Sequence, residues 1–417
     1  MTRIAITGGH LMDPRHGIDE PLDLFVEDGR VRAVGKAPAR FKADQHLAAD
    51  HCLVIPGLVE LGANLGSDSP EVLARETARA AAGGITTLCL PPDMEPCLDG
   101  AASVELMHAR ALRHGVVRIV TLGGLTRDLA GEHLSALGAL AEAGCRGVSN
   151  GHRPIANTLV MRRAMEYAAS HHLTLFVHAR DAWLHAGGCA HEGETATRMG
   201  LPAIPAAAET IAVARELALA ELTGARVHFC RLSAAGSVTM VREARARGMP
   251  VSADVTLAHL YFCDRDIGMF DDSFHTDPPL RDHSDRDALR AGVNDGTITA
   301  ICSDHFPPPG EAANHPFPTA AAGRAGLTTL LPLTLKLAGD DAISPLQALR
   351  LITDAPAALL GLDTGHLAAG APADLCLVDR RQLAAIELDS LLHDPDCPAV
   401  TTHTLVNGRV VSEQNSA

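Results

Sequence analysis

Two side chains in the sequence have the type and position needed to bind a metal or move a proton. His178 lies in the segment FVHARD and Asp304 in ICSDHF, and each follows a predicted β-strand. Imidazoles and carboxylates are common metal ligands and general bases. A single histidine among 22 is more often an ordinary polar residue, and an aspartate before a loop is often a helix cap. The pair therefore has meaning only on a scaffold that brings both residues to one place.

Eight short apolar segments alternate with longer stretches in which apolar residues recur every three or four positions, and this alternation predicts that scaffold. The class is α/β, and the architecture is a parallel (β/α)8 TIM-type barrel over residues 52–360. A doubly wound open sheet is the alternative, weakened by the absence of a GxGxxG or P-loop motif. Functional residues of such barrels lie at the carboxyl ends of the strands. The expected strands are 53–61, 84–91, 116–124, 143–149, 173–179, 225–233, 249–257 and 298–304.

The two ends of the chain have a different pattern from the barrel segments. Residues 1–51 and 361–417 alternate as β-hairpins do, and the dipeptide Asn407-Gly408 is a strong hairpin signal. We expect the two ends to build one small β-rich domain together.

Composition excludes several classes of function. The 417 residues carry a formal charge of −15, which argues against a nucleic-acid partner. No apolar run approaches the roughly 20 residues that cross a bilayer, and the first residues do not resemble a secretion signal. The ten cysteines form no CxxC pair, which argues against a zinc ribbon or a disulfide scaffold. We therefore expect a cytoplasmic protein that binds neither nucleic acid nor membrane.

An ordered set of motifs adds a resemblance to a known family. VIPGLVEL is followed by AAAGGITTLCLPP, RMGLPAIPAAAE, VHFCRLSAAGSV, DPPLR, ICSDHFPPP and GHLAAGAPADLCLVD. Together these segments resemble the dihydroorotases of the amidohydrolase superfamily along nearly the whole chain. The resemblance implies a metal-dependent barrel with a small β domain, which hydrolyses or closes a cyclic amide in pyrimidine synthesis.

The resemblance also implies where the metal ligands of active members should lie, and most are missing here. His178 and Asp304 match the family pattern, with Asp304 at the position of the general base. The His-x-His of the first strand, the acid of the fourth and the second His of the sixth are replaced. The residues at these positions are Gly62, Asn64, Asn150 and Arg231.

The substrate-binding positions that the resemblance implies are altered as well. An arginine and two asparagines of the family motifs correspond here to Gly66, Pro92 and Asp277. A carboxylated lysine cannot bridge two metals either, because residues 43–335 contain no lysine.

The two remaining ligands are too few for catalytic zinc, which takes about three protein ligands. His228 is not expected to replace the ligand lost at position 231, because side chains three residues apart on an extended strand face opposite sides. Arg231 also puts a positive charge where the metal would lie, and repulsion at ~4 Å amounts to several kcal/mol at an effective dielectric of ~20.

We therefore expect a catalytically inactive dihydroorotase-like protein that needs no metal cofactor. The resemblance implies its partner, the catalytic chain of aspartate carbamoyltransferase, for which it would act as a structural subunit, and we expect a homodimer. Two alternatives remain: an active dihydroorotase with a rewired zinc site, and a hydrolase of another cyclic amide. A pocket that handles an acidic ligand through His152, His178, His305 and Arg231 is a further alternative.

Overall fold

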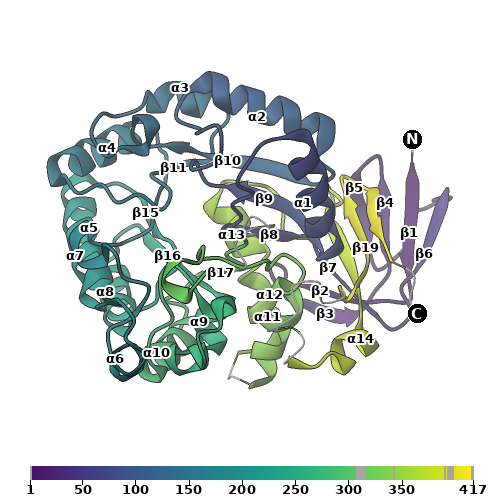
Figure 1. Cartoon of the computed structure of the whole chain (residues 1–417). Coiled ribbons are helices and arrows are strands. Elements are labelled where there is room, and N and C mark those ends of the chain that lie inside the picture. Colours follow the sequence, from purple (N-terminus) through teal and green to yellow (C-terminus); the bar gives the residue numbers. More distant parts are fainter. Residues whose placement is uncertain (1, 307–314, 341–342, 389–390, 392–398, 415–417) are drawn as a thin grey trace.

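A computed structural model describes residues 2–306, 315–340, 343–388, 391 and 399–414 (Figure 1). Eight strands form one sheet in chain order, and every neighbouring pair is parallel. Each of the eight segments expected to be a barrel strand contains one of them, which confirms the predicted (β/α)8 barrel. They are β8 (Leu58–Glu60), β9 (Ile85–Leu90), β10 (Arg118–Gly124), β11 (Gly147–Ser149), β12 (Leu175–Val177), β15 (Val227–Phe229), β16 (Val251–Thr256) and β17 (Ala300–Cys302).

The first and last strands of this order are joined through one loop. The backbone N–H of Val59 in β8 donates to Ile352, and that of Ile301 in β17 donates to the neighbouring Leu351. Inside the barrel lie buried apolar side chains such as Leu122 and Phe176. None of the described helices combines the length and the apolar character needed to span a bilayer.

Helices surround the strands on the outside (Figure 1). α1 shows how the local sequence sets their ends: the Ser69 hydroxyl caps its first turn, Pro70 occupies its first position, and the chain leaves it at Gly83. The helices are α1 (Pro70–Ala82), α2 (Ala101–His114), α3 (Leu137–Glu142), α4 (Thr158–Ser170), α5 (Ala182–His185), α6 (Glu194–Met199), α7 (Ala207–Thr223), α8 (Ala235–Ala246), α9 (Leu257–Tyr261), α10 (His283–Asn294), α11 (Leu330–Asp340), α12 (Pro345–Arg350), α13 (Asp354–Leu359) and α14 (Arg380–Ala385).

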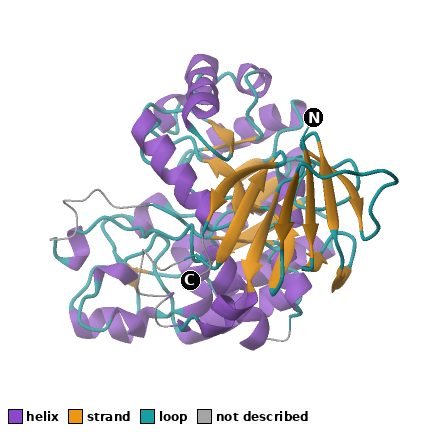
Figure 2. Cartoon of the chain, turned by 90° about the vertical axis from the view of Figure 1, so that its right-hand side faces the viewer, coloured by secondary structure: helices purple, strands orange, loops and turns teal. Residues whose placement is uncertain are grey.

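The two chain ends form a second unit of two packed sheets, as expected from the sequence (Figure 2). One sheet has the order β5 (Arg30–Val34), β4 (Leu24–Glu27), β1 (Arg3–Thr7) and β6 (Gln45–Ala48). The other has the order β20 (Arg409–Glu413), β19 (Thr401–Val406), β18 (Leu375–Asp379), β7 (Cys52–Pro56), β2 (His10–Asp13) and β3 (Ile18–Pro21). Apolar side chains of both sheets, among them Ile4, Leu24, Val54 and Leu377, share one core.

The segment predicted as one strand over 53–61 is in fact two strands. Cys52–Pro56 belongs to the terminal domain, where it lies between β18 and β2, and Leu58–Glu60 opens the barrel. The break falls at Gly57, where a Cβ atom would lie only 2.2 Å from the Thr86 side chain. One short segment thus contributes to both the terminal sheet and the barrel.

Candidate functional site

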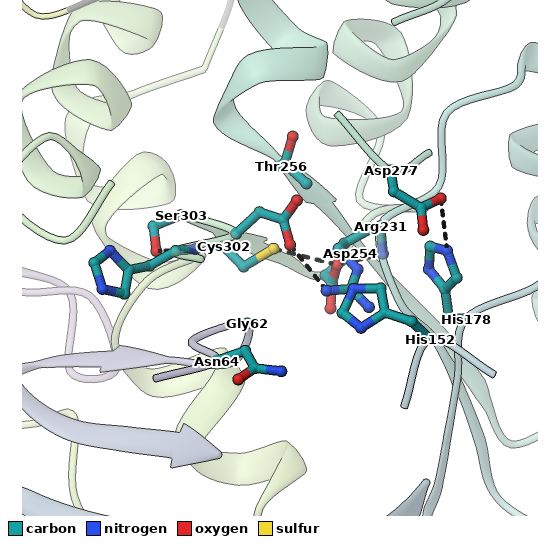
Figure 3. Close-up of polar contacts among 12 residues, drawn as sticks. Gly62, Asn64, His152, His178, Arg231, Asp254, Thr256, Asp277, Cys302 and Ser303 are labelled. Carbon is teal, nitrogen blue, oxygen red and sulfur yellow. Dashed lines mark hydrogen bonds and ion pairs between the residues drawn. The ribbon is translucent and has the colours of Figure 1, made fainter. Parts of the chain in front are cut away.

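The carboxyl ends of the barrel strands meet at one end of the barrel, called the barrel mouth from here on (Figure 3). His178 follows β12, Arg231 follows β15 and Asp304 follows β17, so the predicted residues do reach this end. His178 and Asp304 nevertheless bind different partners. The contacts of each residue determine whether the mouth can bind a metal or transfer a proton.

Asp304 forms an ion pair with Arg231. The guanidinium Nη1 lies 2.8 Å from the carboxylate Oδ1, and the two side chains are only 10% and 16% exposed. Burial opposes the charge of Arg231, but the neighbouring groups, first among them Asp304, together outweigh burial and raise the pKa of the guanidinium. The arginine therefore keeps its charge and neutralises the carboxylate at the predicted general-base position.

His178 is a buried, neutral imidazole. Burial, aided by the Arg231 charge, lowers the pKa of His178 to about 3. Its Nε2 lies 3.5 Å from Asp277 Oδ1, whereas Nδ1 has no hydrogen-bond partner among the described residues. The His152 ring lies beside it, with 5.4 Å between the two ring centroids. His178 is thus the one predicted ligand that retains a free nitrogen at the mouth.

Asp277, at a position where the family resemblance implies a substrate-binding asparagine, is held by three cationic or imidazole side chains. Arg180 Nη1 lies 2.7 Å from Oδ2, and His185 Nε2 lies 3.1 Å from Oδ1, with His178 as the third neighbour. Burial opposes the charge, but the hydrogen bonds from the histidines lower the pKa of Asp277 well below its usual range. The contacts of Arg180 and His185 could not be foreseen, because their shared partner is more than 90 residues away.

Hydrogen bonds and close packing with neighbouring residues occupy the positions where the family resemblance implies the first-strand ligands. The amide of Asn64 donates to Asp93 O at 3.3 Å and accepts from Gly66 N at 2.8 Å. Gly66 has φ +75°, a conformation that disfavours the arginine expected there. At Gly62 a Cβ atom would lie 3.2 Å from Cys302 Sγ, so the surroundings have closed around the missing side chain.

Asn150, in place of the fourth-strand acid, is also fully used. It is buried, accepts from Thr126 Oγ1 at 2.7 Å and donates to the carbonyl oxygens of Leu129 and Arg153. Its amide therefore connects loops and offers no free ligand atom. Pro92, the third altered substrate position, is buried in the loop after β9.

Asp93, next to Pro92, is a site residue that sequence reasoning missed. Its Oδ2 accepts from both the backbone and Nδ1 of His152, at 3.1 and 2.7 Å. Burial opposes its ionisation, but the His152 contacts lower the pKa of Asp93. Only its position after a predicted strand could have pointed to it.

Beneath the mouth, His228 pairs with Asp254 of β16 at 2.9 Å, and its other ring nitrogen contacts Ser252. The expectation that residues 228 and 231 alternate along one strand fails, because β15 ends at Phe229 and Arg231 has φ +55°. Asp254 bridges both, since its Oδ1 accepts from the Arg231 backbone at 2.6 Å. His228, Cys230 and Asp254 form one of two clusters of potential metal ligands among the described residues.

The other cluster, His191 with Asp282 and Asp285, lies at the start of α10. Its carboxylates cap that helix and the start of α8, which accounts for their positions.

His305, expected in the pocket, is directed elsewhere. It is fully buried, with Nε2 3.2 Å from Glu76 of α1. The role of His305 is therefore structural, because its side chain links the loop after β17 to the first helix.

The same region contains Glu60, which the sequence did not single out. Burial raises the pKa of Glu60 to about 7, although it accepts from the backbones of Gly62 and Ser303.

The donor set at the mouth does not fit the metal centre that the family resemblance implies. His178 Nδ1 is available, but Asp304 is bound to Arg231, and the residues at 62, 64 and 150 offer no free ligand. A divalent ion would have to displace the guanidinium and leave it buried without its carboxylate, at a cost of several kcal/mol. The cavity beside His178 and Asn150 measures about 20 Å³, the size of one water molecule.

Comparisons with known proteins agree with the fold and the motifs. The profile of dihydro-orotase-like proteins matches residues 51–237, and that of the amidohydrolase family matches 189–412. A dihydroorotase-like protein of Pseudomonas putida is 38% identical over 98% of both chains. A dihydroorotase of Anaeromyxobacter sp. is 37% identical over 99% of both. Among solved structures, the L-hydantoinase of Arthrobacter aurescens superposes with a TM-score of 0.84 and 21% identity, covering 100% of this chain and 97% of that one.

Proposed function

The chain belongs to the dihydroorotase-like family of amidohydrolases, and we propose that it is a non-catalytic member that serves as a structural subunit of aspartate carbamoyltransferase. The proposal places it in pyrimidine synthesis as a homodimer that binds the catalytic chain of that enzyme. It rests on the family membership, on the motif resemblance and on the chemistry of the barrel mouth.

The observation that carries the loss of catalysis is the ion pair between Arg231 and Asp304. Opening a cyclic amide without a strong electrophile or an activated water is slow, and a general base must be free to accept a proton. Asp304 is bound by a guanidinium that cannot give up its proton. The carboxylate is therefore used to neutralise a buried charge.

The substrate side of the mouth supports the same proposal. Arg180 and His185, which could have bound a substrate carboxylate, are instead occupied by contacts with Asp277. An incoming anion would compete with this internal carboxylate for the same two side chains. Binding of carbamoyl aspartate or dihydroorotate at this place is accordingly expected to be weak.

A second candidate, an active dihydroorotase with a rewired metal site, is favoured by one observation. The ligand atoms of His228, Cys230 and Asp254 lie within 4.8 Å of one another, and Cys302 Sγ lies 3.6 Å from Asp254. Nitrogen, sulfur and oxygen donors of this kind suit zinc. Burial raises the pKa of the Cys230 and Cys302 thiols well above the usual value, however, which opposes the thiolate that zinc requires.

Elemental analysis and two activity assays test the proposal. The purified chain is expected to contain well under one zinc per chain and to show no ring closure of carbamoyl aspartate, with or without added zinc. Co-expression with the carbamoyltransferase from the same genome should give a complex on a sizing column. Tightly bound zinc that His228→Ala removes, together with turnover on the order of 1–10³ s⁻¹, would establish the second candidate instead. Absence of a complex would refute the structural role.

A further inference from the structure

A large groove lies at the opposite end of the barrel from the mouth. It has a volume of about 1280 Å³ and is lined by the start of β10, the residues just before β11, the end of α2 and two turns of the terminal domain. The turns meet closely, since a Cβ atom on Gly408 would lie 2.9 Å from Gly29. No residue of the barrel mouth lines it.

The lining of the groove has the opposite charge to the chain as a whole. Four arginines line it, against the single carboxylate of Asp28, although the chain carries 50 acidic and 35 basic residues. The arginines are Arg30, Arg118, Arg146 and Arg409. A positive groove on a negative protein attracts an acidic occupant over a distance of about one Debye length.

The four arginines divide into two kinds. Arg118 is bound to Asp374 at 2.7 Å, and Arg30 donates to Gly370 O at 2.7 Å, so both help to hold the walls together. Arg146 and Arg409 are exposed, and neither forms an ion pair with a described carboxylate. Two cations are therefore available for a ligand without disturbing the fold.

Apolar side chains lie between these charges. Leu112, near the end of α2, is 88% exposed, and Val116, which follows the helix, is 38% exposed. Both line the groove. Exposed leucine beside unpaired arginine is typical of a protein interface, where apolar anchors are surrounded by charges.

We propose that this groove binds an acidic segment of the carbamoyltransferase that also carries an apolar side chain. The inference rests on the proposed function and adds the surface that performs it. The acidic side chains pair with Arg146 and Arg409, and the apolar side chain covers Leu112. Because the groove and the mouth lie at opposite ends of the barrel, docking leaves the Arg231–Asp304 pair untouched.

The test uses the full chain and the carbamoyltransferase from the same genome, with the dissociation constant measured at two salt concentrations. Arg146→Glu/Arg409→Glu is expected to weaken binding by roughly 10- to 100-fold at low salt and to remove most of the salt dependence. The single variant Leu112→Ser should also weaken binding to the carbamoyltransferase. The matched controls, which make the same substitutions at exposed residues elsewhere, are Arg163→Glu/Arg198→Glu and Leu222→Ser.

The outcomes separate this inference from the proposed function. Wild-type binding that only the groove variants weaken supports it. Wild-type binding that the groove variants and the controls leave equally strong overturns the groove and leaves the structural role intact. No binding by the wild type overturns both. A change in the size of the isolated chain caused by Arg146→Glu/Arg409→Glu would identify the groove as a contact between copies of this chain and would also overturn the inference.

Discussion

The two ends of the barrel use their charged side chains in different ways. At the mouth, Arg231 binds Asp304 and Arg180 binds Asp277, and all four side chains are at least three-quarters buried. At the other end, Arg146 and Arg409 face an open groove. At the mouth the charged side chains bind one another, whereas Arg146 and Arg409 in the groove form no ion pair with a described carboxylate.

This difference shows how buried charges at a barrel mouth can be balanced without a metal ion. A buried carboxylate without a cation is costly, so a barrel that retains Asp304 needs another positive charge near it. Arg231 supplies that charge. Charges at the mouth should therefore contribute to stability, whereas the exposed charges of Arg146 and Arg409 in the groove should contribute only to binding.

The largest expected effect comes from removing one partner of the buried pair. Arg231→Met leaves Asp304 as an uncompensated buried carboxylate and should lower the free energy of unfolding by about 3–5 kcal/mol. Urea-induced unfolding measures this loss of stability. Arg242→Met is the matched control, because its ion pair with Asp295 is 42% exposed on both sides, and it should cost at most about 1 kcal/mol.

The double variant Arg231→Met/Asp304→Asn sharpens the same comparison. It removes both charges, and asparagine tolerates the φ of +52° at position 304. Most of the lost stability should return. A double variant as unstable as Arg231→Met alone would mean that the guanidinium supports the mouth through packing and not through charge.

A pH-dependent effect should follow from Glu60. Its pKa is raised from 4.5 to about 7 by burial, so the stability conferred by the protonated acid is complete below pH 4.5 and is lost as the pH rises to about 7. Between pH 5 and pH 8 the wild type should lose about 2.5 kcal/mol more than Glu60→Gln. Parallel pH profiles of the two proteins would contradict this expectation.

Introducing histidines at the two first-strand positions should destabilise the protein without creating a metal centre. In Gly62→His/Asn64→His, the new side chain at 62 meets Cys302 and the Asn64 hydrogen bonds are lost, at a cost of about 1–3 kcal/mol. Zinc binding and ring closure should stay absent, because Arg231 still opposes the ion. Adding Arg231→His and Asn150→Asp should improve zinc binding before any turnover. Full activity of the first double variant would contradict the account of the mouth given above.

The smallest expected effect belongs to the groove. Arg146→Glu/Arg409→Glu should change the free energy of unfolding by less than about 0.5 kcal/mol, because these exposed arginines have no described carboxylate partner. Thermal unfolding of the isolated chain checks this. A large loss of stability would mean that the two ends of the barrel do not differ as described.

Much of the fold follows from local patterns in the sequence. Short apolar strands and amphipathic helices identify the barrel, and Asn407-Gly408 marks the turn between β19 and β20. The break at Gly57 was not predictable, because it depends on contact with Thr86, and the run of apolar letters continues through it.

The candidate site was predictable only in part. The motifs indicated that the residues at 62, 64, 150 and 231 differ from the metal ligands that the family resemblance implies. They did not indicate which contacts these residues form. Arg231 pairs with Asp304 from a left-handed backbone position, and no spacing rule predicts either feature. His152 and Asp93 are 59 residues apart, and their pairing exists only in the folded barrel.

The paired chain ends have a consequence for the order of synthesis. β7 lies between β2 and β18. β7 is synthesised early, but it cannot pair on both sides until β18, which begins at residue 375, has also been synthesised. Until the ribosome has released that part, β7 keeps one unpaired edge and Val54 lacks the cover of Leu377. The barrel strands appear in chain order and can pair as they emerge, whereas the terminal domain can close only at the end. A chain cut short before β18 would therefore expose an apolar sheet edge that cellular quality control can recognise.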